Sequence, residues 1–233
     1  MLSTGAAIAV PYLAAARLTG LPAHFIESAA RTTGPSLTGR LVAAVPGVRL
    51  YNQSRGWNGS RWHFAGSVFE AFCPSVPRRT PNRPLRVVVM LGTMRFTFDR
   101  LVRGVLRALP EGAELTWQVG HTEPPRADTA VTRFLTHTAL TKAIAEADVV
   151  VSHAGVGSVL LALDAGRCPV VIPRRATYRE HVDDHQVATA SALAELGLAI
   201  SRDADDLETD DLIASASSAV ERLENLPALQ LRI

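Results

Sequence analysis

Short runs of branched apolar residues alternate with segments of helical periodicity, and this alternation most constrains how the chain can fold. Residues 85–91 read LRVVVML, an almost continuous apolar run that is typical of a strand buried on both faces of a sheet. A glycine loop and then apolar residues at helical spacing follow this run. Such an order predicts a parallel α/β sheet, in which ligands bind at the carboxyl ends of the strands.

The same pattern predicts a strand and helix order for most of the chain. Strands are expected at residues 23–26, 48–51, 85–91, 115–119, 148–152, 169–172 and 198–201. Helices are expected at residues 6–18, 36–45, 98–109, 140–147, 158–165 and 185–196. Residues 1–5 read as the end of a strand and a glycine turn, so we expect a segment to be missing upstream.

A segment rich in proline and arginine divides the chain. Residues 73–84 read CPSVPRRTPNRP, which fits neither helix nor strand periodicity. We therefore expect a partial α/β domain in residues 1–75, a linker in residues 76–84 and a second α/β domain in residues 85–233.

The charge is unevenly distributed between these parts. Residues 1–86 carry ten arginines against two glutamates, whereas residues 87–233 carry fourteen basic and twenty acidic side chains. The net charge of +2 does not predict a nucleic-acid-binding protein. The basic part suits an anionic membrane surface.

Two cysteines without a CxxC pair and no signal peptide predict a cytoplasmic protein, peripheral on the inner face of the membrane.

The most informative local pattern is the strand, glycine loop and helix of residues 147–158, ADVVVSHAGVGS. Backbone N–H groups at the start of such a helix can bind phosphate oxygens, which suits a diphosphate. The alternative is a tight turn whose glycines only permit close packing. The pattern is not a dinucleotide fingerprint, because Leu160 stands at the third glycine position.

A second polar cluster follows the run at 171–175, VIPRR. His181 and His185 are four residues apart, with Asp183 and Asp184 between them. This spacing is compatible with a binding site for a divalent metal, but the sequence contains no third His or Cys ligand nearby. We therefore predict no metal, and expect these residues to cap the helix or to bind sugar hydroxyls.

Several of these motifs together resemble the C-terminal donor domain of glycosyltransferase family 28. The resemblance covers residues 85–200 and rests on MLGT at 90–93, QVG at 118–120, SHAGVGS at 152–158, GRCPVVIPRR at 166–175 and DDHQ at 183–186. Residues 2–72 resemble the later part of the acceptor and membrane-anchoring subunit of the two-part UDP-N-acetylglucosamine transferase. That likeness rests on STGAAIAVP at 3–11, IES at 26–28 and GPSLTGRL at 34–41.

The resemblance implies a GT-B-like architecture of two Rossmann-like parallel-sheet domains, the N-terminal one truncated. It implies no cofactor and no metal, with a nucleotide sugar as the substrate. The residues it places at the donor are Gly92, Thr93, Gln118, Gly120, His153, Gly155, Gly157, Ser158, Pro173, Arg174, Asp184, His185 and Gln186. The family usually has a ribose-binding glutamate at the position of Leu161, and Asp164 is the nearest carboxylate that can replace it.

On the acceptor side, Glu27 follows a predicted strand and is the candidate catalytic base or acceptor ligand. Its alternative roles are to cap the next turn or to pair with Arg31. Ser3, Thr4 and Gly5 precede the first predicted helix and are candidates for binding an acceptor diphosphate, unless they form a plain turn.

Trp57, Trp62 and Phe64 alternate with arginines, which is compatible with a membrane patch or a sugar platform. We favour a third interpretation, in which they cover the core where the acceptor half joins the linker.

Taken together, the sequence predicts inverting, metal-independent transfer of a sugar from UDP-N-acetylglucosamine or a similar UDP-sugar. The acceptor would be lipid-linked or a polysaccharide precursor. The alternative is a catalytically incomplete donor-binding module that needs a partner chain supplying the missing N-terminal acceptor region. The expected partners also include a second copy of the chain. A nucleotide-sugar epimerase is a third, less favoured interpretation.

Overall fold

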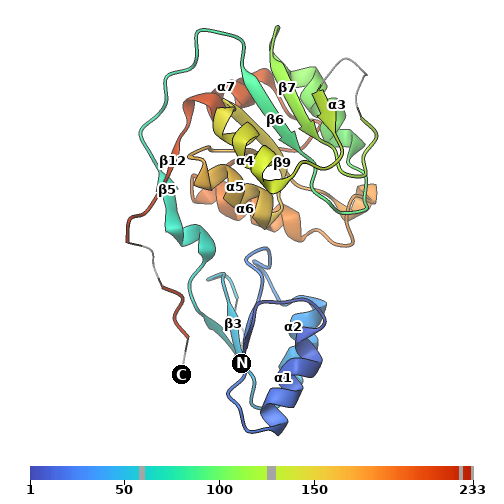
Figure 1. Ribbon diagram of the computed structural model, residues 1–233, viewed down its shortest axis with the longest axis vertical. Helices are drawn as coiled ribbons and strands as arrows, with labels where there is room; N and C mark the ends of the chain where they lie inside the picture. The colour runs from blue at the N-terminus through green and yellow to red at the C-terminus, as the bar shows by residue number, and fades with distance from the viewer. Residues whose placement is uncertain (58–60, 125–129, 226–227, 232–233) are drawn as a thin grey trace. The chain divides into compact units, whose positions relative to one another are not determined.

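The computed structural model describes residues 1–57, 61–124, 130–225 and 228–231. These residues form two compact units, one of Met1–Ala71 with Asn225–Ile233 and the other of Phe72–Glu224 (Figure 1). We call them the N-terminal and the C-terminal unit and describe each by itself.

The N-terminal unit is a four-stranded parallel sheet with two helices. Its strands lie in the order β1 (Leu2–Ser3), β2 (His24–Ile26), β3 (Arg49–Asn52) and β4 (Trp62–Phe64). Helices α1 (Ala9–Leu18) and α2 (Leu37–Ala43) pack with one face of the sheet around Leu13, Phe25, Val42 and Leu50 (Figure 1). A short 3₁₀ helix, η1, spans Val68–Ala71.

Local chemistry sets the ends of these two helices. Ala6 has a φ of 60° and lies outside α1, which begins at Ala9, three residues later than predicted. Pro11 then falls in the first turn, where its missing N–H costs no hydrogen bond. The Ser36 hydroxyl caps α2 by accepting the N–H of Gly39 at 3.0 Å.

The aromatic residues near β4 belong to the core. Trp62 packs edge-on against Phe25 at 6.2 Å and against Trp57 at 4.8 Å between ring centroids. The Trp57 indole N–H donates to the carbonyl of Arg31 at 2.8 Å. These contacts confirm that the two tryptophans cover the core of this unit.

The C-terminal unit contains a six-stranded sheet in which every strand pair is parallel. Its strands lie in the order β11 (Ile200–Ser201), β10 (Val170–Ile172), β9 (Val149–His153), β6 (Arg86–Met90), β7 (Glu114–Gln118) and β8 (Ala130–Thr132). Its helices are α3 (Asp99–Ala108), α4 (His137–Glu146), α5 (Val156–Asp164), α6 (His185–Glu195) and α7 (Thr209–Ser217), with a 3₁₀ turn η2 (Ala176–Tyr178). Strands β5 (Phe72–Pro74) and β12 (Val220–Arg222) form a separate antiparallel pair.

The apolar run at 85–91 is buried on both faces, as its composition predicts. Val87 and Val89 pack toward α3 and α7 with Phe98, Leu101 and Leu212. On the opposite face Val88 and Met90 pack toward α4 and α5 with Leu140, Ile144 and Ala162. The fold class of two parallel α/β units is therefore as predicted.

The strand order reverses direction between β6 and β9, since β7 and β8 lie on one side and β10 and β11 on the other. In sheets of this kind ligands bind outside the carboxyl ends of the strands at such a reversal. The loops after β6 and β9 are therefore the first place to look for a site.

The structure divides the chain differently from the predicted boundaries at both ends of the second unit. Residues 72–74 form β5, which pairs with β12 of that unit. The described residues after Asn225 belong instead to the N-terminal unit, because the Gln230 N–H donates to the Ala65 carbonyl at 2.7 Å and Leu231 packs with Ile26 and Tyr51. Among the described residues no helix is long and apolar enough to cross a membrane.

Candidate functional site

The three loops that leave β6, β7 and β9 pack closely because glycines allow it. A Cβ at Gly155 would lie 2.3 Å from Nε2 of His153, and one at Gly92 would lie 2.7 Å from Cε1 of the same ring. A Cβ at Gly120 would lie 2.3 Å from the Gly92 carbonyl oxygen. The structure thus brings Gly92, Gly120, His153 and Gly155 together, and packing alone accounts for these three glycines.

Gly157 differs from those glycines. It lies in the first turn of α5, is exposed, and a Cβ built on it meets no atom within 4 Å. The N–H groups of a first helical turn have no partner within the helix and attract anions. The open surface at Gly157 and the half-buried Ser158 therefore suits a phosphate group. Thr93 is exposed on the loop after β6.

His153 is the buried centre of this loop cluster. Its Nδ1 lies 3.4 Å from the Met90 carbonyl oxygen, and the Ser152 hydroxyl donates to the His153 carbonyl at 3.0 Å. Burial, and after it the positive charge of Arg174, lower the pKa of His153 to about 4. The imidazole is therefore neutral at physiological pH.

Arg174 holds the loop after β6 in place. Its guanidinium is buried and donates from Nη1 to the carbonyls of Phe96 and Thr97, both at 3.0 Å, and of Glu180 at 3.2 Å. Nη2 donates to the Leu91 carbonyl at 2.6 Å. Burial lowers the pKa of Arg174 to about 10, so the group stays charged at neutral pH. The resemblance placed Arg174 at the donor, and the structural role of its side chain was missed.

A buried ion-pair network next to Arg174 was also missed by the sequence analysis. Arg100 makes a bidentate pair with Glu180 at 3.1 and 3.0 Å and a further pair with Asp203. Arg175 also pairs with Asp203, at 2.8 Å. This network ties α3 to the loop between β10 and α6. Glu180 and Asp203 lie 80 and 103 residues from Arg100 in sequence, so no local sequence pattern predicts these ion pairs.

Three residues that were predicted to bind the donor sugar nucleotide each use one side-chain oxygen to accept a backbone N–H of a loop. Gln118 accepts the N–H of Leu135 at 3.1 Å, and Gln186 accepts the N–H of Arg174 at 3.1 Å. Asp184 accepts the N–H of Ala176 at 2.8 Å. Pro173 immediately follows β10, whose final residue is Ile172. The donor contacts of all these residues stay predictions.

His185 starts α6 close to His181 and Asp183. The two imidazole rings are 4.6 Å apart, and Nδ1 of each faces the Asp183 carboxylate. Burial lowers the pKa of His181. Asp183 thus supplies the third potential ligand that the sequence analysis did not recognise, since only His and Cys were considered for it.

The two residues at the expected ribose position have other contacts. Leu161 packs against the cluster that contains Val88, Met90 and Ile144. Asp164 pairs with Arg222 of β12 at 2.8 Å.

In the N-terminal unit, Glu27 is buried and closes the loop that follows β2. Its Oε1 accepts the N–H of Ser28 at 3.0 Å, and its Oε2 accepts the N–H and the hydroxyl of Ser36, both at 2.9 Å. These are the contacts of the capping alternative. A catalytic role for Glu27 stays a prediction.

Ser3, Thr4 and Gly5 do not open α1, contrary to the expectation. Ser3 ends β1, Gly5 has a φ of 139°, and the helix starts only at Ala9. The helix N-terminus therefore gives no reason for these three residues to bind a diphosphate.

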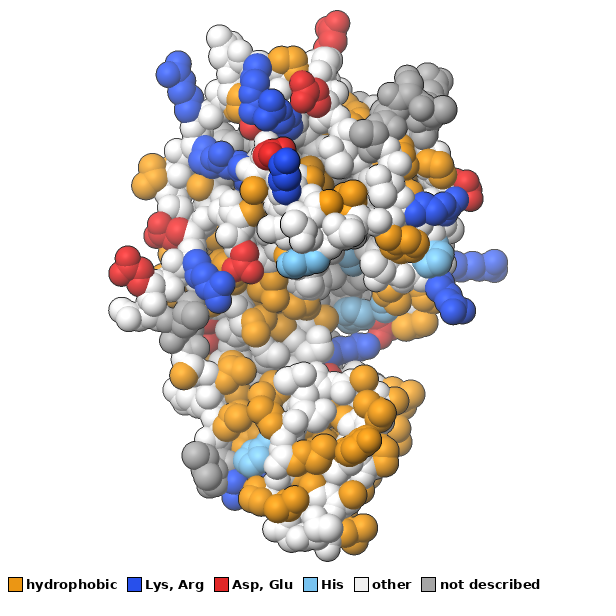
Figure 2. Space-filling view, in the orientation of Figure 1, with side chains coloured by type: hydrophobic (Ala, Val, Ile, Leu, Met, Phe, Trp, Pro, Cys, Tyr) orange, Lys and Arg blue, Asp and Glu red, His pale blue; other side chains and the backbone are white. Residues whose placement is uncertain are grey.

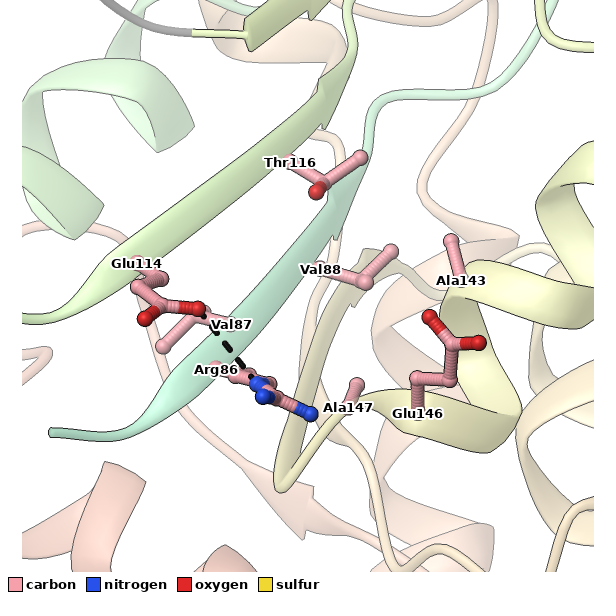
Figure 3. Close-up of a pocket in the computed structure, with 8 residues that line it drawn as sticks. All are labelled: Arg86, Val87, Val88, Glu114, Thr116, Ala143, Glu146 and Ala147. Carbon is pink, nitrogen blue, oxygen red and sulfur yellow. Dashed lines mark ion pairs between the residues drawn. The ribbon is translucent and has the colours of Figure 1, made fainter. Parts of the chain in front are cut away.

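A hollow of about 300 Å³ lies at the amino-terminal ends of the strands of the C-terminal sheet. Its lining comes from the amino-terminal halves of β6 and β7 and from the end of α4, with Arg86 and Glu114 forming an ion pair at 3.4 Å (Figure 3). Because ligand sites of parallel sheets lie at the carboxyl ends, we do not assign it to the site.

Two parallel α/β units, with glycine loops at the strand reversal of the second, define a GT-B glycosyltransferase fold. MurG from Acinetobacter baumannii aligns with a TM-score of 0.59 at 22% identity, over 91% of this chain and 63% of that one. SnogD from Streptomyces nogalater aligns with a TM-score of 0.52 at 17% identity, over 88% of this chain and 63% of that one.

Residues 86–225 match the glycosyltransferase family 28 C-terminal domain, and the chain belongs to this family. It is also similar to two enzymes named UDP-N-acetylglucosamine–N-acetylmuramyl-(pentapeptide) pyrophosphoryl-undecaprenol N-acetylglucosamine transferase. The one from Prochlorococcus marinus is 30% identical over 86% of this chain, and the one from Magnetococcus marinus is 28% identical over 84%. The chain spans 57% and 56% of their lengths.

Proposed function

We propose that this chain transfers a sugar from a UDP-sugar, of the UDP-N-acetylglucosamine class, to a lipid-linked or polysaccharide-precursor acceptor. The observation that carries the proposal is the open first turn of α5 at the strand reversal, in a chain of family 28. Neighbouring glycines are accounted for by packing against His153, whereas Gly157 leaves space that the protein itself does not fill.

The chemistry proposed for this site needs no metal or cofactor. The acceptor hydroxyl oxygen attacks the anomeric carbon, the bond from that carbon to the diphosphate oxygen breaks, and UDP leaves with the electron pair. N–H groups of the first turn of α5 stabilise the leaving diphosphate. The proton of the hydroxyl passes to a base, for which Glu27 is the residue to test first.

The acceptor side of the proposal includes contact with a cytoplasmic membrane surface. Exposed apolar side chains lie four residues apart at two places: Ile8, just before α1, with Tyr12 on α1, and Leu37 with Leu41 on α2. Hydrophobic side chains cover much of the surface over these helices (Figure 2). Six arginines against two glutamates in residues 1–71 favour anionic lipid. We expect cosedimentation with phosphatidylglycerol vesicles, weakened by Tyr12→Ser and Leu37→Ser together.

The test of transfer is an assay of UDP release from a panel of UDP-sugars, with and without bacterial lipid extract. Acceptor-dependent release identifies a transferase. Mass-neutral conversion of the sugar without acceptor would identify an epimerase, and no turnover with any donor would contradict both.

A second candidate function is favoured by the edge of the N-terminal sheet. β1 is a two-residue edge strand with Leu2 exposed. The backbone groups of an edge strand can pair with a strand of another chain. We propose that a partner chain, or a second copy, pairs with β1 and completes the acceptor side.

The two candidates differ in what the purified chain does alone. UDP binding without transfer, with activity restored by a second polypeptide that protects β1 amides from hydrogen exchange, supports the partner chain. Transfer by the isolated monomer would contradict it.

A further inference from the structure

We propose that His181, Asp183 and His185 form a binding site for one divalent transition-metal ion of the zinc class. The three residues come from a single five-residue segment that leads into α6. One ring nitrogen of each histidine and one carboxylate oxygen of Asp183 all lie within 4.8 Å of one another.

The spacing of these atoms fits a small tetrahedral ion. With metal–ligand bonds of roughly 2.0–2.2 Å, two ligands of a tetrahedral zinc ion are about 3.3 Å apart. The distance from His181 Nδ1 to the Asp183 carboxylate is 3.2 Å. The His185 ring lies closer to the same oxygen, so small side-chain rotations suffice to admit an ion.

The hydrogen bonding around His181 is a second, independent observation. The backbone N–H of Asp183 donates to His181 Nδ1 at 3.3 Å, and an N–H can only donate. A ring nitrogen that accepts this bond carries no proton, which is the state that a metal ligand requires. The bond is longer than the usual value of about 2.9–3.0 Å, so an ion that coordinates Nδ1 replaces only a weak hydrogen bond.

The donor set selects the kind of ion. Two imidazole nitrogens and one carboxylate suit Zn²⁺, Co²⁺ or Ni²⁺ better than Mg²⁺ or Ca²⁺, which prefer oxygen ligands only. His181 is buried against Phe96, whose ring centroid is 6.1 Å away, whereas the Asp183 side chain is 36% exposed. The metal would keep a solvent-side position open for a fourth ligand.

The site also has a consequence that rests on the proposed function. His185 is one of the residues expected to contact the donor sugar, and a metal-bound imidazole is unavailable for that contact. Bound zinc is therefore an inhibitor of transfer, not a participant in it.

The test is calorimetric titration of the tag-free protein with Zn²⁺, together with the visible absorption of the Co²⁺ form. We expect one ion per chain and the intense visible bands of four-coordinate Co²⁺. His185→Gln and Asp183→Asn should each weaken zinc binding by at least 10–100-fold, which is the usual cost of disturbing even a supporting group at a metal site.

His137→Gln is the matched control, because His137 is an exposed histidine at the start of α4. It should bind zinc as the unsubstituted protein does. The proposal is overturned if no binding occurs at millimolar Zn²⁺, if Co²⁺ gives no such bands, or if the control loses binding as strongly as His185→Gln.

A UDP titration in the presence of a chelator separates this inference from the proposed function. UDP binding without zinc binding would overturn only the metal site. Zinc binding without UDP binding would overturn only the proposed transferase and the inhibition derived from it.

Discussion

At the scale of single residues, the buried His153 makes the free energy of unfolding depend on pH. Its folded pKa of about 4 is below the ordinary value of 6.5, so between these pH values only the unfolded chain binds a proton there. This contribution to stability is complete above pH 6.5 and is lost as the pH falls through 4. The difference is roughly 3 kcal/mol.

We therefore expect the free energy of unfolding to fall more steeply with acid in the unsubstituted protein than in His153→Gln. Urea unfolding between pH 4 and 7 measures both slopes. Equal slopes would show that the imidazole is not held neutral.

Glu27 gives a second prediction at this scale. Removing its carboxylate leaves the Ser28 and Ser36 N–H groups without their acceptor in a partly buried loop. Glu27→Ala should therefore lower the free energy of unfolding of the N-terminal unit by about 2–4 kcal/mol. The exposed Glu111→Ala should change it little. A folded Glu27→Gln variant with wild-type stability but strongly reduced transfer would favour the catalytic role instead.

At the scale of elements, the loop of residues 91–98 depends on the Arg174 guanidinium from the loop after β10. Arg174→Met leaves carbonyls of that loop without donors, and we expect a loss of about 3 kcal/mol or more. Hydrogen exchange of the amides at residues 92–98 should accelerate, and UDP binding should weaken. The exposed Arg103→Met on α3 is the control. Unchanged exchange in Arg174→Met would contradict this positioning role.

The sequence predicts those elements whose structure follows from their own residues, and misses those that depend on pairing with distant segments. The strand at 85–91 and helix α3 follow from apolar periodicity, and both lie within two residues of the predicted bounds. Strands β4 and β12 were not predicted, because each has three residues and acquires its structure by pairing. Helix α7 was also missed, because its capping box is formed by Glu208 and Asp211 and does not have the usual Ser/Thr-x-x-Glu/Gln sequence.

The candidate site shows the same division. The glycine loops at 92, 120 and 155 were found from sequence because a larger residue does not fit there: Gly92 and Gly120 have a positive φ, and a Cβ at Gly155 would meet the His153 ring. The contacts of Arg174, Arg100 and Glu180 were not, since they join segments that only the folded sheet brings together. The position of Asp183 beside two histidines likewise depends on the bends before α6.

At the scale of the whole molecule, the chain should unfold as two units. A chain ending at Glu224 loses the Leu231 packing and the Gln230 hydrogen bond, both made to the N-terminal unit. We expect that unit alone to be destabilised by about 1–2 kcal/mol. Calorimetry with and without the tail would show this as a shift of one transition. An equal shift of both transitions would contradict the independence of the units.

The most direct test of the central claim is a calorimetric titration of the purified chain with UDP. We predict one binding site that is lost in Gly157→Trp, because a Cβ at this position meets no atom within 4 Å and the indole would occupy the open space at α5. Glu146→Trp, at the far end of α4, should bind UDP normally. No binding at millimolar UDP, or equal binding by Gly157→Trp, would contradict the account.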